Sequence, residues 1–155
     1  DNAYQIFAKN NLQNGWYDNS WTKASPNIST SVAKTGTSSF IMVYPAGAWQ
    51  VEGFASSSGA VYSADYKYLS FWIKGGTVDH TLNIESDQAA GWGQNDINPI
   101  VVPAGVWTYF KIPLSTLGLN GWSASQPLTS LAFFLKGQSG DVDETYYLDD
   151  VILVK

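Results

Sequence analysis

The sequence predicts an all-β fold, and two observations lead to this prediction. Short apolar or alternating runs, bounded by Gly, Pro, Asn and Ser, fill most of the chain, whereas helical periodicity is almost absent. The chain has 155 residues, of which 45% are hydrophobic and 14% charged, which suits one packed domain over residues 1–155. Many short strands at this spacing are typical of a sandwich or a barrel.

The expected strands follow the apolar runs in chain order. They lie near residues 4–8, 28–32, 39–44, 48–54, 68–74, 81–86, 106–112, 131–136 and 145–154. One helical turn is expected in "PLSTLG", residues 113–118. No linker, internal repeat or low-complexity tract divides the chain, so the sequence predicts one domain.

Alternation along three of these strands separates a core face from a mixed face. In 68–74, Leu69 and Ile73 share one face while Trp72 shares the other. The runs 81–86 and 131–136 repeat this pattern. If the strands neighbour each other, one sheet face carries Trp72, Glu85, Asp87, Phe134 and Lys136. The alternative interpretation is a solvated outer face with scattered aromatic rings.

Composition limits the partners of this chain. The net charge is −5 and only 8 residues are basic, without a cluster, so nucleic acid and anionic membranes are disfavoured and a neutral ligand fits better. The 7 Trp and 9 Tyr exceed what a core of this size needs, so some rings are expected at the surface. The absence of cysteine excludes disulfides and thiolate metal sites, and the sequence contains no signal peptide or transmembrane run.

Four ordered segments carry a resemblance to a known group of proteins. They are "IF…LQNGWYDNSW", "YLSFWIKGG", "VPAGVWTYFKIPLSTLG" and "YYLDDVILV". Together they resemble the β-jelly-roll carbohydrate-binding modules of polysaccharide-degrading enzymes and surface glycan-binding proteins. The resemblance implies a β-sandwich (jelly roll) of two antiparallel sheets and a polysaccharide ligand. It also implies a larger multimodular enzyme or surface glycan-binding protein as context, and an extracellular or cell-surface location.

The tryptophans divide into packing and binding candidates. In the opening stretch, Trp16 is expected to pack in the core or at an edge, and Trp21 is a possible contributor to a ligand platform. Trp107 is structural in proteins of this resemblance and is interpreted so here. The surface candidates are Trp49, Trp72, Trp92 and Trp122.

Sugar binding needs rings and hydrogen-bonding groups together. The C–H faces of a pyranose stack on aromatic rings, and its hydroxyls need polar partners. The chain offers Glu52, Asn83, Glu85, Asp87, Gln88 and Asn95 for the hydroxyls. We therefore expect a non-catalytic module for a neutral, β-glucan-type polysaccharide such as cellulose or another plant cell-wall glucan.

The alternative is a small jelly-roll glycoside hydrolase or lyase. Some jelly-roll glucanases carry a Glu-x-Asp-x-x-Glu motif, but here Ala90 replaces the last acid after Glu85 and Asp87. Glu52 could pair with Glu85 only if their strands adjoin. The lone His80 supports neither a catalytic triad nor a histidine metal cluster. A third interpretation is a structural sandwich that mediates adhesion between proteins.

The resemblance also implies a structural Ca²⁺. Asp149 matches the C-terminal ligand of that site in similar proteins, and Asp150 is its neighbour. Lys9 and Asn10 stand where an N-terminal acid is expected, which departs from the pattern. The alternative is that these aspartates bind backbone groups at a sheet edge.

Overall fold

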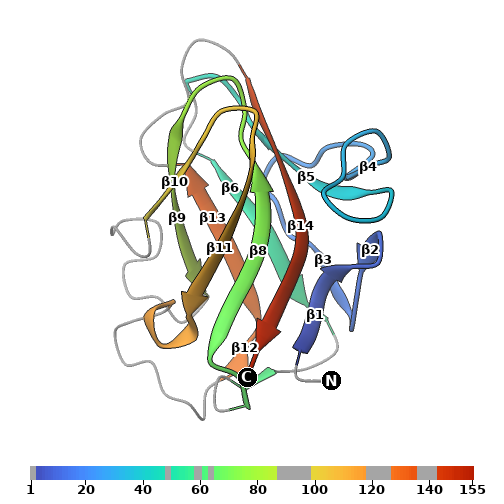
Figure 1. The fold of residues 1–155 in the computed structure, drawn as a ribbon, viewed down its shortest axis with the longest axis vertical. Coiled ribbons are helices and arrows are strands. Elements are labelled where there is room, and N and C mark those ends of the chain that lie inside the picture. The colour runs from blue at the N-terminus through green and yellow to red at the C-terminus, as the bar shows by residue number, and fades with distance from the viewer. Residues whose placement is uncertain are drawn as a thin grey trace.

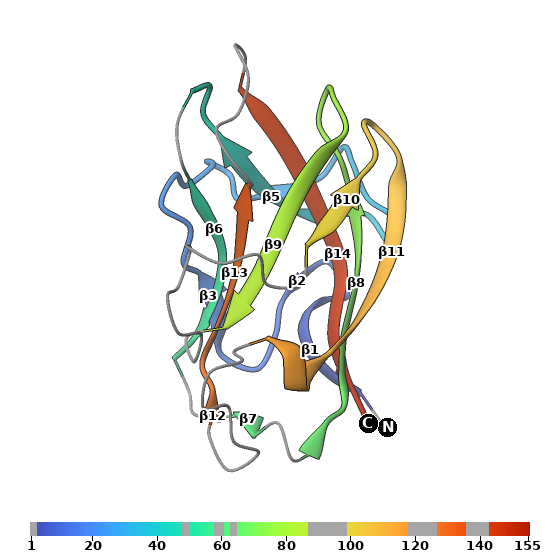
Figure 2. The ribbon, with the colours of Figure 1, turned by 90° about the vertical axis from the view of Figure 1, so that its left-hand side faces the viewer.

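Two antiparallel sheets pack face to face as a β-sandwich, which confirms the predicted fold class (Figures 1 and 2). This computed structural model describes residues 3–47, 50–57, 61–62, 65–86, 99–117, 127–135 and 143–155. In these residues, sheet A has seven strands and sheet B has five, and β7 (Val61–Tyr62) pairs with β12 (Pro127–Leu128) as a short ribbon. No helix in the described segments is long and apolar enough to span a membrane.

Sheet A contains the first and last of the described strands. Its main order is β11-β8-β14-β1-β2, and β5 pairs with both β14 and β4. The bounds are β1 Ala3–Ala8, β2 Asn11–Leu12, β4 Ile28–Ser29, β5 Ser39–Tyr44, β8 Tyr68–Lys74, β11 Trp107–Pro113 and β14 Glu144–Val154. The predicted helical turn is a 3₁₀ helix, Leu114–Thr116, directly after β11.

Sheet B lies behind sheet A in Figure 1 and is separated from it in Figure 2. Its order is β10-β9-β13-β6-β3, so β3 and β10 form the two edges. The bounds are β3 Trp16–Asp18, β6 Val51–Ser56, β9 His80–Ser86, β10 Ile100–Val102 and β13 Ser130–Leu135.

The core lies between the sheets and is rich in aromatic rings. Phe71 of sheet A meets Phe133 of sheet B edge to face, with 5.4 Å between ring centroids. Phe40 and Phe54 bridge the sheets at 4.5 Å. Because successive side chains of a strand alternate in direction, the residues between these inward ones form two outer faces, one on each sheet.

Candidate functional site

The outer face of sheet B is defined by the strand register. Ala132 lies opposite both Gly53 of β6 and Glu85 of β9, and in the next row Phe134 lies opposite Val51 and Asn83. Their neighbours Phe54 and Phe133 point into the core. The outer face of sheet B therefore has small residues in one row and an apolar cluster of Val51, Ala132 and Phe134 that is separate from the main core.

Two exposed rings stand on the edge strand of this face. Tyr17 of β3 lies opposite Ala55 and is 45% exposed. Beyond β3 the pairing continues, since Asn19 N–H donates to the Gly53 carbonyl at 3.0 Å and Trp21 N–H to that of Val51 at 2.9 Å. Trp21, 56% exposed, therefore shares the face of Tyr17. The two rings are four positions apart in the sequence, roughly 13 Å along an extended strand.

The face is hollowed near both of its edges. Between the rings, Asn19, Trp21, Gly53 and Ala132 help to line a small hollow of about 20 Å³. Near the β9–β10 edge, a wider hollow of about 280 Å³ is lined by Asp79, His80, Thr81 and Val101. Thr81 and Val101 are paired neighbours on the outward side, so both hollows belong to the same sheet face.

Two polar side chains lie on this face between the hollows. Asn83 and Glu85 alternate with the inward Leu82 and Ile84 of β9, and both polar residues are buried. Their positions agree with the predicted mixed face of this strand. Because Glu85 is completely buried and Asn83 nearly so, they belong to the packed part of this face, and the exposed polar side chain beside the rings is Asn19.

The fold of this chain is similar to that of solved carbohydrate-binding modules. No protein-family model matches this chain. No curated protein sequence matches it. The family 11 carbohydrate-binding module of the cellulosomal cellulase Lic26A-Cel5E of Clostridium thermocellum superposes with a TM-score of 0.60 at 17% identity, over 98% of this chain and 94% of that one.

Two variants of a family 29 module give similar values. One, complexed with cellulohexaose, has a TM-score of 0.57 at 12% identity over 98% of this chain and 89% of that one. Another, complexed with mannohexaose, has 0.59 at 12% over 97% and 89%. This chain shares the β-sandwich fold of these carbohydrate-binding modules. The predicted resemblance is therefore confirmed at the level of the fold.

The structure separates Trp72 from Glu85, which the sequence had placed together. The sequence placed Trp72 and Glu85 on one sheet face, but β8 belongs to sheet A and β9 to sheet B. The connection after Lys74 crosses from one sheet to the other, so strands adjacent in sequence are not neighbours in space. Trp72 and Glu85 therefore lie on opposite outer faces of the sandwich, and the prediction that they share one face is wrong.

The position of Glu52 contradicts its predicted roles in sugar binding and in a catalytic pair. Glu52 alternates with the outward Val51 and Gly53, and its side chain is completely buried on the inward side of β6. Gln50 Nε2 donates to Glu52 Oε1 at 3.1 Å. Burial raises the pKa of Glu52 to about 7, the Asp18 carboxylate adds to the rise, and hydrogen bonds from Ser20 and Gln50 oppose it.

This position excludes the predicted catalytic pair. β13 lies between β6 and β9, and Glu52 and Glu85 point to opposite sides of sheet B. No substrate on one face can contact both carboxyl groups. The predicted role of Glu52 in sugar binding is also wrong, because its side chain is completely buried on the inward side of sheet B.

Six further predicted ligand residues lie outside the described segments: Trp49, Asp87, Gln88, Trp92, Asn95 and Trp122. Their roles stay predictions.

Tyr17 was not among the predicted candidates, because a three-residue strand is too short to show alternation. The interpretation of the opening stretch agrees with the structure: Trp16 is buried and its Nε1–H donates to the Tyr4 hydroxyl at 3.1 Å, whereas Trp21 is exposed.

Trp107 lies on the outer face of sheet A, and its predicted structural role stays a prediction. It alternates with the inward Phe110 and Ile112 of β11, and it is only half-buried. It lies opposite Lys74 on the outer face of sheet A.

The predicted calcium ligands make hydrogen bonds within the protein. Asp149 Oδ2 accepts the N–H groups of Lys34 and Thr35, both at 2.9 Å, and its Oδ1 accepts that of Asp150 at 2.9 Å. Asn10 Oδ1 holds the other end of the same loop by accepting the N–H groups of Thr37 at 2.7 Å and Ser38 at 3.0 Å.

This arrangement does not fit a cation. N–H donors aimed at Asp149 Oδ2 suit an anionic acceptor and would oppose a metal ion at the same oxygen. In the segments that the structure describes, no three His, Cys, Asp or Glu side chains are grouped to hold a metal. Thr35 Oγ1 donates to Asp150 Oδ2 at 2.9 Å, so the second aspartate joins the same loop contacts.

Proposed function

We propose that this chain is a non-catalytic module that binds a neutral, β-linked polysaccharide of the β-glucan type on the outer face of sheet B. The observation that carries this proposal is the pair of exposed rings, Tyr17 and Trp21, on the side of the sheet that also bears the exposed Asn19. A ring takes the C–H face of a sugar, and the neighbouring amide of Asn19 offers a donor and an acceptor to its hydroxyls.

Magnitudes favour weak, multi-contact binding. By analogy with base stacking, each ring contributes about 1–3 kcal/mol. Two rings and a few hydrogen bonds, less the entropy lost on association, give dissociation constants on the order of micromolar to millimolar. Such affinity is useful when the ligand is a long polymer and the module is tethered to a catalytic partner, because proximity then raises the local substrate concentration.

The structural relatives support this assignment. The family 29 variants were solved with cellulohexaose and mannohexaose, and the family 11 module belongs to a cellulosomal cellulase. By analogy, we propose an extracellular or cell-surface module that directs a linked enzyme or surface glycan-binding protein to cell-wall polysaccharide. Trp49, Trp92, Trp122, Asp87, Gln88 and Asn95 remain proposed contributors.

Alanine variants on the two outer faces test the proposal. Tyr17→Ala and Trp21→Ala should each weaken binding to soluble β-glucan or glucomannan about 5- to 150-fold, the equivalent of one lost stack. Tyr109→Ala is the matched control, because Tyr109 is 49% exposed on the opposite sheet. Titration calorimetry measures affinity, and thermal melts confirm that each variant folds.

Two outcomes would count against the proposal. Wild-type affinity in both Tyr17→Ala and Trp21→Ala would place the binding face elsewhere. Steady release of reducing sugar from a bound glucan, abolished by Glu85→Gln, would identify an enzyme instead of a binding module.

A further inference from the structure

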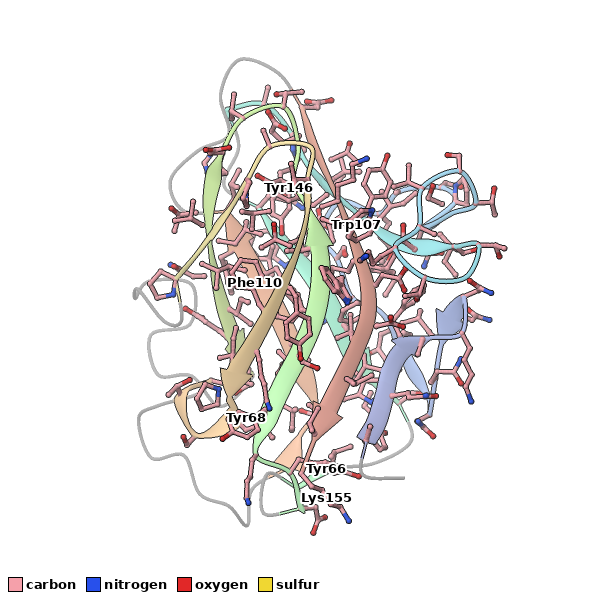
Figure 3. All side chains as sticks on the ribbon, viewed as in Figure 1. Tyr66, Tyr68, Trp107, Phe110, Tyr146 and Lys155 are labelled. Carbon is pink, nitrogen blue, oxygen red and sulfur yellow. The ribbon has the colours of Figure 1, made fainter. Side chains whose placement is uncertain are left out.

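The outer face of sheet A carries a second set of rings, and these alternate with lysines. In one row across the strands, Trp107 of β11, Lys74 of β8 and Tyr147 of β14 lie side by side. In the next row, Tyr109 lies opposite Trp72. In Figure 3 the outer face of sheet A is toward the viewer, and Trp107 lies near the upper end of this face and Tyr68 near its lower end.

The rings and cations of this face are in contact. The ring centroids of Trp72 and Tyr109 are 5.3 Å apart, with an interplanar angle of 53°. Lys34 Nζ lies 4.4 Å from the centroid of Trp72, and Lys111 Nζ lies 4.3 Å from that of Tyr68. Tyr109 still exposes nearly half of its surface. The face therefore combines accessible aromatic surface with ammonium groups held beside it.

The charge of this face differs from that of the whole chain. The chain has a net charge of −5 and only 8 basic residues. Three of the basic residues lie on this face: Lys34, Lys74 and Lys111. Among the described residues of β8, β11 and β14, the acids beside this face are Asp149 and Asp150, and both accept hydrogen bonds from the 34–35 segment. Three ammonium groups against two carboxylates leave a small positive balance on this face of an acidic protein, and the carboxylates already accept hydrogen bonds.

We propose that the outer face of sheet A is a second binding surface, for an acidic polysaccharide whose sugars carry carboxylates. Trp107 and Tyr147 flank Lys74 at one strand spacing on either side, roughly 5 Å each. Sugars stacked on these two rings would bring an intervening carboxylate to the Lys74 ammonium. Trp72 and Tyr109 extend the platform by one row, roughly 7 Å along the strands.

A polyuronate fits this pattern better than an acidic peptide. A peptide that recognises a sheet usually adds to an edge strand through backbone hydrogen bonds. The rings and lysines of this surface are side chains on the outer face of β8, β11 and β14, so they offer a surface for stacking and charge pairing and not backbone groups. A group of partly exposed rings favours a ligand with apolar ring faces, and the lysines select for negative charge. The surface is independent of the site proposed on sheet B.

Binding to polygalacturonate tests the proposal. Its fully methyl-esterified form is a neutral control polymer, and polyglutamate is an acidic control that lacks sugar rings. Tyr109→Ala should weaken polygalacturonate binding about 5- to 150-fold. Lys74→Met, which keeps the apolar stem, should weaken it up to about fivefold and reduce its dependence on salt. Trp21→Ala on the opposite face should leave this binding unchanged.

The outcomes separate the two sites. Polygalacturonate binding that weakens with added salt and is lost in Tyr109→Ala, while β-glucan binding is kept, would support the proposal. Absence of polygalacturonate binding at low salt would overturn it, and so would wild-type affinity in Tyr109→Ala. Equal or tighter binding of polyglutamate would also overturn it, in favour of an acidic protein partner. Loss of β-glucan binding in Trp21→Ala bears only on sheet B.

Discussion

At the scale of single residues, Glu52 places an ionisable group inside the sandwich. Glu52 lies on the inward side of β6 and accepts a hydrogen bond from Gln50, which directly precedes this strand, near the buried Tyr44. Burial is the main reason that the pKa of Tyr44 is raised well above its usual range, and the Glu52 carboxylate is the second. The folded protein therefore holds a proton on Glu52 more tightly than the unfolded chain does.

This proton makes stability depend on pH. The pKa of Glu52 rises from 4.5 to about 7 on folding, so the folded state binds more protons between these values and stability falls as pH rises through that window. Glu52→Gln should remove this loss and stabilise the protein at pH ~8 by up to about 3 kcal/mol. Urea unfolding of both proteins at pH ~5 and ~8 measures the difference.

Asp150→Asn is the control for this comparison, because burial also raises the pKa of Asp150. Its Asn variant reports how much of the slope comes from the second carboxyl. An unchanged pH slope in Glu52→Gln would mean that Glu52 stays ionised in the folded protein.

The sequence contained a sign that Glu52 points into the core, but the composition of its neighbouring residues obscured it. Glu52 and Phe54 are two apart and so share a side of the strand, and Phe54 is a core residue. Polar character alone suggested a surface role. Trp21 was easier to judge, because its stretch is rich in aromatic and polar residues, but only the pairing with Val51 places it on a particular face.

At the scale of elements, Gly53 sets the close approach of β6 and β13. A methyl group at Gly53 would lie 2.0 Å from the Leu131 carbonyl oxygen, and its φ is +155°. Its missing side chain also helps to form the small hollow beside Trp21. One residue therefore contributes both to strand pairing and to the shape of the proposed binding face.

Gly53→Ala should destabilise the protein by about 1–3 kcal/mol or more, because the added methyl group must push β6 away from β13. Gly47→Ala is the matched control: its φ is +65°, but no atom lies within 4 Å of the added carbon. That variant should cost only about 1 kcal/mol of backbone strain. Chemical unfolding measures both, and equal losses would contradict the steric explanation.

Long strands were predictable, and sheet membership was not. The alternation in 68–74, 81–86 and 131–136 identified β8, β9 and β13 with their inward sides. The two- and three-residue strands β2, β3, β7, β10 and β12 were not predicted, because they carry too few residues for a periodic pattern; the equally short β4 lies within the expected strand 28–32. Pairing partners depend on contacts between distant segments, so the separation of Trp72 from Glu85 could not be read from local pattern.

At the scale of the whole molecule, the 34–38 loop joins the start of the chain to its end. Asn10 and Asp149 hold its N–H groups from opposite sides. Because these bonds satisfy the carboxylate without a cation, we expect a chelator to leave the melting temperature unchanged. A fall on chelation, reversed by added Ca²⁺, would show that an ion bound to the native state stabilises it.

Asp149→Asn is the companion variant in this experiment. It replaces charge-assisted hydrogen bonds by neutral ones and should lower stability by about 1–3 kcal/mol, with or without chelator. Thermal melts in both conditions distinguish a hydrogen-bonded loop from a metal site.

The central place of β14 in sheet A affects how the chain can fold during synthesis. β14 is the last of the described strands, yet it pairs with β1, β5 and β8. While the ribosome is still making the chain, these three strands have emerged without the partner that joins them. Sheet A can close only after β14 leaves the ribosomal tunnel, so the nascent chain must keep unpaired strand edges from aggregating until translation of this segment is complete.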